Sequence, residues 1–156
     1  MRITLDKYWQ WSLAAIVATG MMQSVKAEED TATVKAELDQ FFQNASAVIQ
    51  NSGSAKALAD VFYDDDLNII GEEDKHLYPN LQSFMGPLQA YITNRACELK
   101  VVGTPRHSGN LAVAFVKEHC DQYKSEPPAD YRVVYVLRKG FKGWRVTMEM
   151  WEHGVF

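Results

Sequence analysis

The sequence has 156 residues, of which 47% are hydrophobic and 23% are charged. This length fits one domain, and the composition excludes a disordered chain, which would be poorer in apolar residues and richer in charge. The net charge of −4 at pH 7 argues against a nucleic-acid partner or an anionic lipid surface, because both require basic patches.

Residues 1–27 have the features of a secretory signal peptide. A weakly basic start precedes an apolar stretch over residues 12–22, and Val25-Lys26-Ala27 supplies the small residues of a cleavage site. The stretch is shorter than the ~20 apolar residues that span a bilayer, which favours cleavage after Ala27 over a retained membrane anchor. Cleavage removes three basic residues and one acidic residue, so the single domain over residues 28–156 has a net charge of −6. We expect it to be periplasmic or secreted.

Two helices are expected at the start of this domain. Hydrophobic residues recur at spacings of three and four from Val34 to Ile49, which indicates one long amphipathic helix. The segment Asn51-Ser52-Gly53-Ser54 ends it, and Ser54 can cap a short second helix that continues to Phe62.

A short strand and a third helix are expected next. The run Asp64-Asp65-Asp66 is typical of a solvated turn, and residues 67–71 have the composition of a strand that stops at Gly71. After a loop, Pro87 is expected to be the first residue of a helix that ends near Asn94.

From Ala96 onward the hydrophobic period changes to two, which indicates strands. Four strands separated by turns rich in Gly, Pro and Ser are predicted, over residues 97–103, 111–120, 131–139 and 144–152. Helices followed by a strand meander predict an α+β fold, in which a curved, mostly antiparallel sheet wraps around the long N-terminal helix.

The two cysteines test how the predicted strands over residues 97–103 and 111–120 pair with each other. If Val101 faces Val116, then Cys97 faces Cys120. Two cysteines in an oxidising compartment are more often paired than free, so a disulfide between them is predicted. The alternative is that they are two separate small core residues.

Four segments carry a family resemblance through their order and spacing. They are the amphipathic first helix, the stretch from Leu58 to Gly71, the helix start at Gly86-Pro87-Leu88, and the closing run from Tyr135 to Val146. Together they resemble the nuclear transport factor 2-like superfamily, which includes the SnoaL-like polyketide cyclases and the ketosteroid isomerases. The resemblance implies a cone with an apolar pocket at its open end and a homodimer formed through the outer sheet face. It implies no reaction, because this fold hosts several chemistries and proteins with none.

The chain departs from the family pattern in two places: the first disfavours steroid-isomerase chemistry, and the second removes two candidate polar residues of the pocket. When Phe62 and Asp64-Asp65 are aligned on the isomerase motif, the general base falls on Ile70, which accepts no proton. Many SnoaL-like relatives also have histidines in the last strand, where this chain has Met148 and Met150.

The candidate acid–base residues are His76, Tyr78, Tyr91 and Glu118. A histidine titrates near neutral pH, which suits His76, although a polar surface loop is the alternative for it. Glu118 and its neighbour His119 point to opposite faces of a strand, so only one of them can serve the pocket.

Regular alternation in the last strand places Met148 with Trp144 and Val146 on one face, and Glu149 on the other, where an ion pair with Arg132 is expected. Large residues on predicted apolar faces are the candidates for ligand binding, with plain core as the alternative: Phe41, Phe62, Phe84, Tyr91, Phe115, Tyr135 and Met148.

The sequence has no zinc-site spacing, glycine-rich phosphate loop or nucleophile elbow, so no metal or cofactor is expected. The leading hypothesis is an exported protein that binds a small apolar molecule, with no catalysis assigned and no membrane contact after signal cleavage. One alternative is a periplasmic inhibitor of immunity type that uses its acidic surface. The other is a SnoaL-like isomerase, cyclase or hydrolase.

Overall fold

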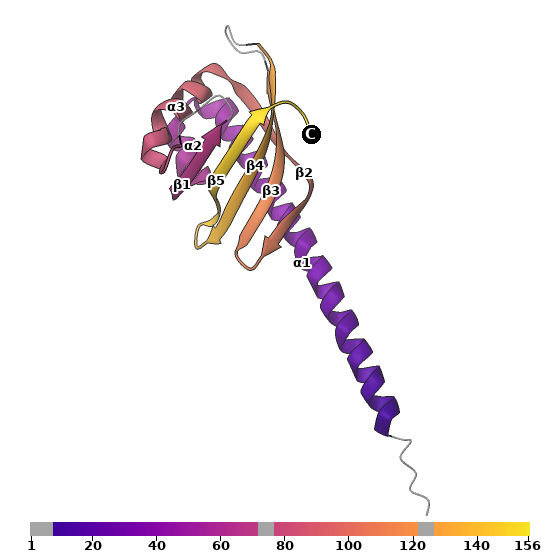
Figure 1. The fold of residues 1–156 in the computed structure, drawn as a ribbon. Coiled ribbons are helices and arrows are strands. Elements are labelled where there is room, and N and C mark those ends of the chain that lie inside the picture. The colour runs from indigo at the N-terminus through magenta and orange to yellow at the C-terminus, as the bar shows by residue number, and fades with distance from the viewer. Residues whose placement is uncertain (1–7, 72–76, 122–126) are drawn as a thin grey trace, which may run out of the picture.

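The computed structural model describes residues 8–71, 77–121 and 127–156, with side chains from Asp30 onward (Figure 1). Its helices and strands follow the chain in the order α1 (Tyr8–Ser52), α2 (Ala55–Phe62), β1 (Tyr63–Gly71), α3 (Leu81–Asn94), β2 (Ala96–Ser108), β3 (Leu111–Asp121), β4 (Ala129–Gly140) and β5 (Gly143–His153). The predicted α+β class is confirmed. Among the described residues, no helix combines the length and the hydropathy needed to cross a membrane.

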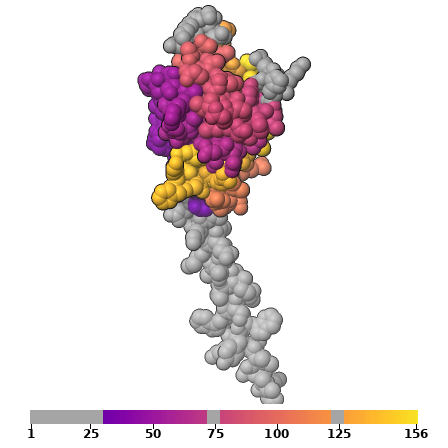
Figure 2. Space-filling view, turned by 90° about the vertical axis from the view of Figure 1, so that its left-hand side faces the viewer, coloured from indigo at the N-terminus to yellow at the C-terminus, as the bar shows by residue number. Residues whose placement is uncertain are grey.

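The five strands form one curved, unclosed sheet in the order β1-β5-β4-β3-β2. The last four strands are an antiparallel meander, and β1 joins its end by pairing parallel with β5. The helices pack on one face of the sheet, with α1 against β2 and the pair α2 and α3 near β1. Figure 2 shows that α2, β1 and α3 cover one side of the domain above the β4–β5 hairpin.

The long helix α1 lies against the sheet through the hydrophobic stripe that the sequence predicts. Val34, Leu38, Phe42 and Ile49 are all buried there. Ser46 links this stripe to the sheet, because its hydroxyl donates to the carbonyl of Phe42 at 2.9 Å and accepts from the amide of Leu99 at 2.8 Å.

The second helix begins and ends as predicted. The Ser54 side chain accepts a hydrogen bond from the amide of Ala57 at 3.3 Å, which is the expected N-cap. Phe62 at the end of this helix is 1% exposed. Its ring is stacked on Phe41 with the centroids 5.0 Å apart and meets the edge of Tyr135 at 5.5 Å.

Two predictions around β1 and α3 were wrong. The run Asp64-Asp65-Asp66 lies inside β1 rather than in a turn, because Asp64 forms an ion pair with Arg138 at 2.9 Å. Helix α3 begins at Leu81 instead of at Pro87, because the side chain of Asn80 caps it by accepting from the amide of Ser83, and it contains Pro87 in its interior.

Strand β2 is longer than predicted and extends to Ser108 instead of ending at Gly103. The pairing with β3 is interrupted between Val102 and Arg106 and then resumes, and Gly103 in the gap has a φ of 69°. A glycine tolerates that conformation without strain, so the strand bends there instead of ending.

The predicted register of the β2–β3 hairpin is confirmed. Val101 faces Val116 and Cys97 faces Cys120, and the two cysteines form a disulfide buried in the core.

Replacing both cysteines by alanine is expected to lower the free energy of unfolding by about 2–4 kcal/mol, because the bridge closes a loop between residues 23 apart in the sequence. Urea denaturation followed by tryptophan fluorescence measures this loss. Wild-type protein that has been reduced while unfolded and then refolded under reducing conditions is the control and should match the double variant. A loss below about 0.5 kcal/mol would contradict a structural role for the bridge.

Candidate functional site

A cavity of about 330 Å³ opens between the helices and the inward face of the sheet. Its walls include Ile49 from α1, Leu58 from α2, Leu88 from α3 and Leu99 from β2. Most of the remaining lining is aromatic: Phe62, Tyr63, Tyr78, Phe84, Tyr91, Tyr131, Tyr135 and Trp151. A cavity of this size and lining is typical of a site for a small organic molecule.

Two carboxyl groups line this cavity, and each is held by a tyrosine. Glu118 on β3 and Glu149 on β5 are both 7% exposed. The hydroxyl of Tyr91 donates to Oε1 of Glu118 at 2.8 Å, and the hydroxyl of Tyr63 donates to Oε2 of Glu149 at 2.8 Å. Within the described ranges, the second oxygen of each carboxyl group receives no hydrogen bond from the protein.

A bulge in β5 turns Glu149 toward the cavity. Leu137 pairs with Val146 and Val136 with Met148, so Thr147 is an extra residue in the ladder. The Thr147 hydroxyl donates to the carbonyl of Val136 at 3.2 Å, which helps to hold the irregularity. Before the bulge the even-numbered residues Trp144 and Val146 face inward, and after it the odd-numbered residues do. Glu149 therefore lies on the inward face, as Val146 does.

Burial raises the pKa of both carboxyl groups into the neutral range. The pKa of Glu149 is raised to about 8, mainly by loss of hydration and further by the charge of Glu118, against the opposing hydrogen bond from Tyr63. Burial also raises the pKa of Glu118 to about 7, while the hydrogen bond from Tyr91 and the charge of Arg95 oppose the shift. At pH 7 the cavity therefore holds one carboxyl group that is mostly protonated and one that is about half ionised.

Tyr135 adds a polar atom to the same region. Its side chain is 2% exposed and its ring packs against Phe42 with the centroids 5.1 Å apart. Burial raises the pKa of its hydroxyl well above 10, and the charges of Glu149 and Glu118 raise that pKa further. Among the described residues, no hydrogen-bond partner reaches this hydroxyl.

Among the described residues that line the cavity, Arg95 is the single cationic side chain. It follows α3, and its guanidinium group lies 5.6 Å from the centre of the Tyr131 ring, within cation–π distance. The site thus combines two acids, one cationic side chain and several aromatic faces.

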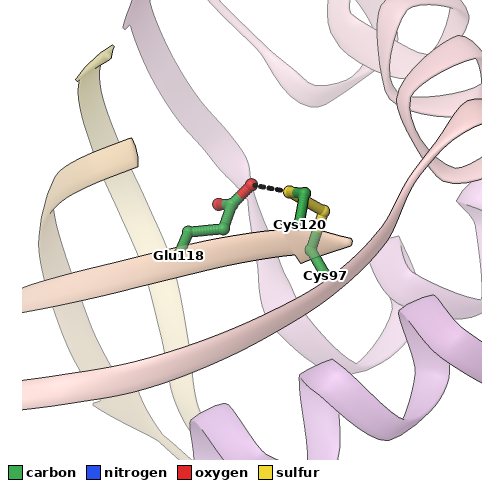
Figure 3. A group of neighbouring side chains, drawn as sticks. All are labelled: Cys97, Glu118 and Cys120. Carbon is green, nitrogen blue, oxygen red and sulfur yellow. Dashed lines mark hydrogen bonds between the residues drawn. A yellow bond between two sulfur atoms is a disulfide. The ribbon is translucent and has the colours of Figure 1, made fainter. Parts of the chain in front are cut away.

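The disulfide borders the site. Figure 3 shows Glu118 beside the bridge, with Sγ of Cys120 3.3 Å from Oε1 of the carboxyl group. Glu118, Cys97 and Cys120 bring three donor atoms within 4.8 Å of one another. Cysteine binds metals as the thiolate, so the bridged sulfurs are not the ligand type that such a cluster needs.

Several residues singled out from the sequence lie together at this cavity: Phe62, Tyr78, Phe84, Tyr91, Glu118 and Tyr135. Phe41 is stacked behind Phe62 and does not line the cavity. His119 lies on the other face of β3, where Nδ1 is 2.9 Å from Asp130. His76 falls outside the described residues.

Phe115 and Met148 lie on the outer face of the sheet instead of in the cavity. Phe115 is 40% exposed and its ring is 6.0 Å from that of Phe156. Met148 was placed inward by regular alternation, which the bulge at Thr147 breaks. The predicted ion pair between Arg132 and Glu149 is also absent from the described residues, because Arg132 pairs with Glu152.

Glu149 was missed as a site residue, although the sequence carries one sign of it. Trp144 and Trp151 are an odd number of residues apart, so a regular strand would place them on opposite faces. Both large aromatic side chains turn inward in the structure, which requires an irregularity between them.

No family model and no curated protein matches the sequence. Solved structures do resemble the fold. A nuclear transport factor 2-like protein of unknown function from Pseudomonas putida has 13% identity and a TM-score of 0.64, over 80% of this chain and 89% of that one. A ketosteroid isomerase-like protein from Erwinia carotovora atroseptica has 15% identity and a TM-score of 0.60, over 82% and 98% of the two chains.

A nuclear transport factor 2-like superfamily protein from Salmonella enterica gives a similar result, with 17% identity and a TM-score of 0.62 over 81% of this chain and 94% of that one. At such identities the likeness concerns the fold and not the reaction. The curved sheet, the helices on its inner face and these neighbours together assign the chain to the nuclear transport factor 2-like fold.

Proposed function

We propose that the protein binds a small, largely apolar molecule in this cavity and that Glu118, Glu149 and Tyr135 contact the molecule's polar group. One observation carries the proposal. The aromatic cavity contains three buried polar groups whose hydrogen-bonding capacity is not filled by the described residues. These groups belong to buried residues that line the cavity, where a bound ligand can supply the partners that polar groups in the protein interior normally have.

Export is part of the same proposal. A chain cleaved after Ala27 keeps the part of α1 that packs on the sheet: Oγ1 of Thr31 is 3.1 Å from Nε2 of His107, and Val34, Leu38, Phe42 and Ile49 are buried. In this proposal the mature protein begins at residue 28 and folds after export with these contacts in place.

Acid–base catalysis on the bound molecule is a second candidate, favoured by the two carboxyl groups in one cavity. A general acid and a general base work best when their pKa values lie near the working pH, and Glu149 and Glu118 are raised to about 8 and about 7. An open cavity of this kind gives less support to the inhibitor hypothesis, for which a cone filled by its own side chains would be expected.

Titration with N-phenyl-1-naphthylamine, an uncharged fluorescent apolar probe, tests the binding function. We expect fluorescence to rise on binding, because the probe leaves water for an aromatic cavity. Ala90 is an exposed residue of α3 that lines the cavity, and Ala90→Trp should obstruct the opening and weaken binding at least about tenfold.

Gln82→Trp is the matched control, because Gln82 is exposed on the same helix and does not line the cavity. It should bind the probe as the wild type does. An unresponsive wild type, or equal weakening by both tryptophan variants, would contradict a ligand site in this cavity.

A further inference from the structure

Three polar positions of the cavity are open to a ligand, and all three can accept a hydrogen bond once the carboxyl groups are ionised. They are Oε2 of Glu118, Oε1 of Glu149 and the hydroxyl of Tyr135. The charges of both glutamates act on the Tyr135 hydroxyl, which places the three groups in one neighbourhood. A primary ammonium group has three N–H donors and no acceptor, which complements such a set. We propose that the cavity takes an organic cation, a protonated amine on a small apolar body, and this inference rests on the proposed binding function.

The charge balance of the site favours the same ligand. Two acids are buried in one cavity with aromatic walls, and Arg95 is the single cationic side chain among the described lining residues. A buried carboxylate is costly unless a positive charge accompanies it. A cationic ligand supplies that second positive charge, whereas a neutral or anionic ligand leaves at least one acid to be neutralised by a proton.

The walls suit a cation as well as its apolar body. The faces of tyrosine and tryptophan rings attract positive charge, and Tyr78, Tyr131 and Trp151 line the cavity. Arg95 already lies over the ring of Tyr131. Leu58, Ile69 and Leu88 provide an aliphatic wall for the hydrocarbon part of the ligand.

The pH dependence of binding separates a cation from other ligands. Several other titratable or charged side chains surround the two carboxyl groups. Those that line the cavity are Tyr63 on β1, Tyr78 after it, Tyr91 and Arg95 at α3, and Tyr131 and Tyr135 on β4. His153 lies beside Tyr131. The walls from α1, α2 and β2 are apolar, and the Cys97–Cys120 bridge does not titrate. Among the residues that line the cavity, Glu118 and Glu149 have their pKa values raised into the neutral range, so these two groups change the charge of the lining between pH 6 and pH 8.

An ammonium ligand binds best when these carboxyl groups are ionised. Alkylamines stay protonated well above pH 8, as the lysine side chain does with its pKa of ~10.4. Because the pKa of Glu118 is about 7, ionising this group alone should strengthen amine binding about tenfold between pH 6 and pH 8. A carbonyl or carboxylate ligand needs the protonated acids as donors, so its binding should weaken over the same interval.

Displacement of N-phenyl-1-naphthylamine by three ligands with similar bodies tests the inference on the protein as it is purified. The ligands are 2-phenylethylamine, 2-phenylethanol and 3-phenylpropionate, each titrated at pH 6, 7 and 8. We expect the amine to displace the probe at the lowest concentration at pH 8 and its affinity to rise about tenfold from pH 6. Calorimetry in two buffers of different ionisation enthalpy should show protons released on amine binding.

Two variants complete the test. Glu118→Gln and Glu149→Gln should each weaken binding of the amine at pH 8 about tenfold more than binding of the alcohol, and both should flatten the pH dependence. Glu152→Gln, which alters an exposed carboxyl group paired with Arg132, is the control and should bind the amine like the wild type. The inference is overturned if the alcohol or the propionate is preferred, if amine affinity falls as the pH rises, or if the amine does not displace the probe. Failure of the probe to bind the wild type would instead overturn the proposed binding function.

Discussion

Glu149→Gln is expected to stabilise the protein at pH 9 by about 3–5 kcal/mol and to change its stability little at pH 5. The folded state raises the pKa of Glu149 from 4.5 to about 8, so it holds a proton that the unfolded chain releases. Stability from this group is therefore greatest below pH 4.5, falls as the pH rises toward 8, and stays at its lowest above that. Glutamine has no proton to lose, and its amide oxygen can still accept the hydrogen bond from Tyr63.

Urea denaturation at pH 5, 7 and 9 measures this difference. Glu152→Gln is the matched control, because Glu152 lies on the same strand with its side chain 50% exposed, and its pH profile should follow the wild type. If Glu149→Gln and the wild type lose stability equally between pH 5 and pH 9, the carboxyl group is not held in a buried, protonated state.

Phe62→Ala is expected to lower the free energy of unfolding by about 3–5 kcal/mol. The Phe62 ring is almost fully buried and contacts four other rings, with centroid distances from 4.8 Å to Tyr63 up to 5.8 Å to Phe42. Its loss removes apolar burial and enlarges the cavity, since the same ring forms part of the cavity wall.

Thermal and urea unfolding of the variant measure this loss. Phe141→Ala is the control, because Phe141 lies in the β4–β5 turn with its ring in solvent, and it should change stability by less than about 0.5 kcal/mol. A loss below about 1 kcal/mol for Phe62→Ala would show that the ring cluster is not part of a tightly packed core.

The sequence predicted the helices and the hairpin whose formation depends on residues close together in the chain. The stripe from Val34 to Ile49 has helical spacing because one face of α1 lies on the sheet, and Ser54 caps α2 through its own side chain. The Cys97–Cys120 pairing was predictable because a hairpin with a short turn fixes which residues face each other.

The errors arose where distant contacts override local preference. Asp64 belongs to a strand because Arg138, far along the chain, lies beside it. Helix α3 continues past Pro87 because Leu88 and Ile92, which follow the proline, are buried against the rest of the core. No single-sequence pattern specifies these partners.

The candidate site was predicted in part for the same reason. Glu118 shares a strand face with buried Val116 and Cys120, so its inward position follows from regular alternation. Glu149 lies beyond a bulge whose position depends on two neighbouring strands, since β1 is also irregular opposite Thr147. Regular alternation of side chains along a strand therefore predicts the inward position of Glu118 but not that of Glu149.

The bulge at Thr147 also decides how this chain should be aligned with others. Counted without a gap from Trp144, the histidine positions of the SnoaL-like relatives fall on Met148 and Met150, which turn outward. If the last strand of a relative is regular, the structurally equivalent positions lie one residue later, at Glu149 and Trp151, and both of these line the cavity. A comparison that opens a one-residue gap at Thr147 thus finds a titratable group where an ungapped comparison finds a thioether.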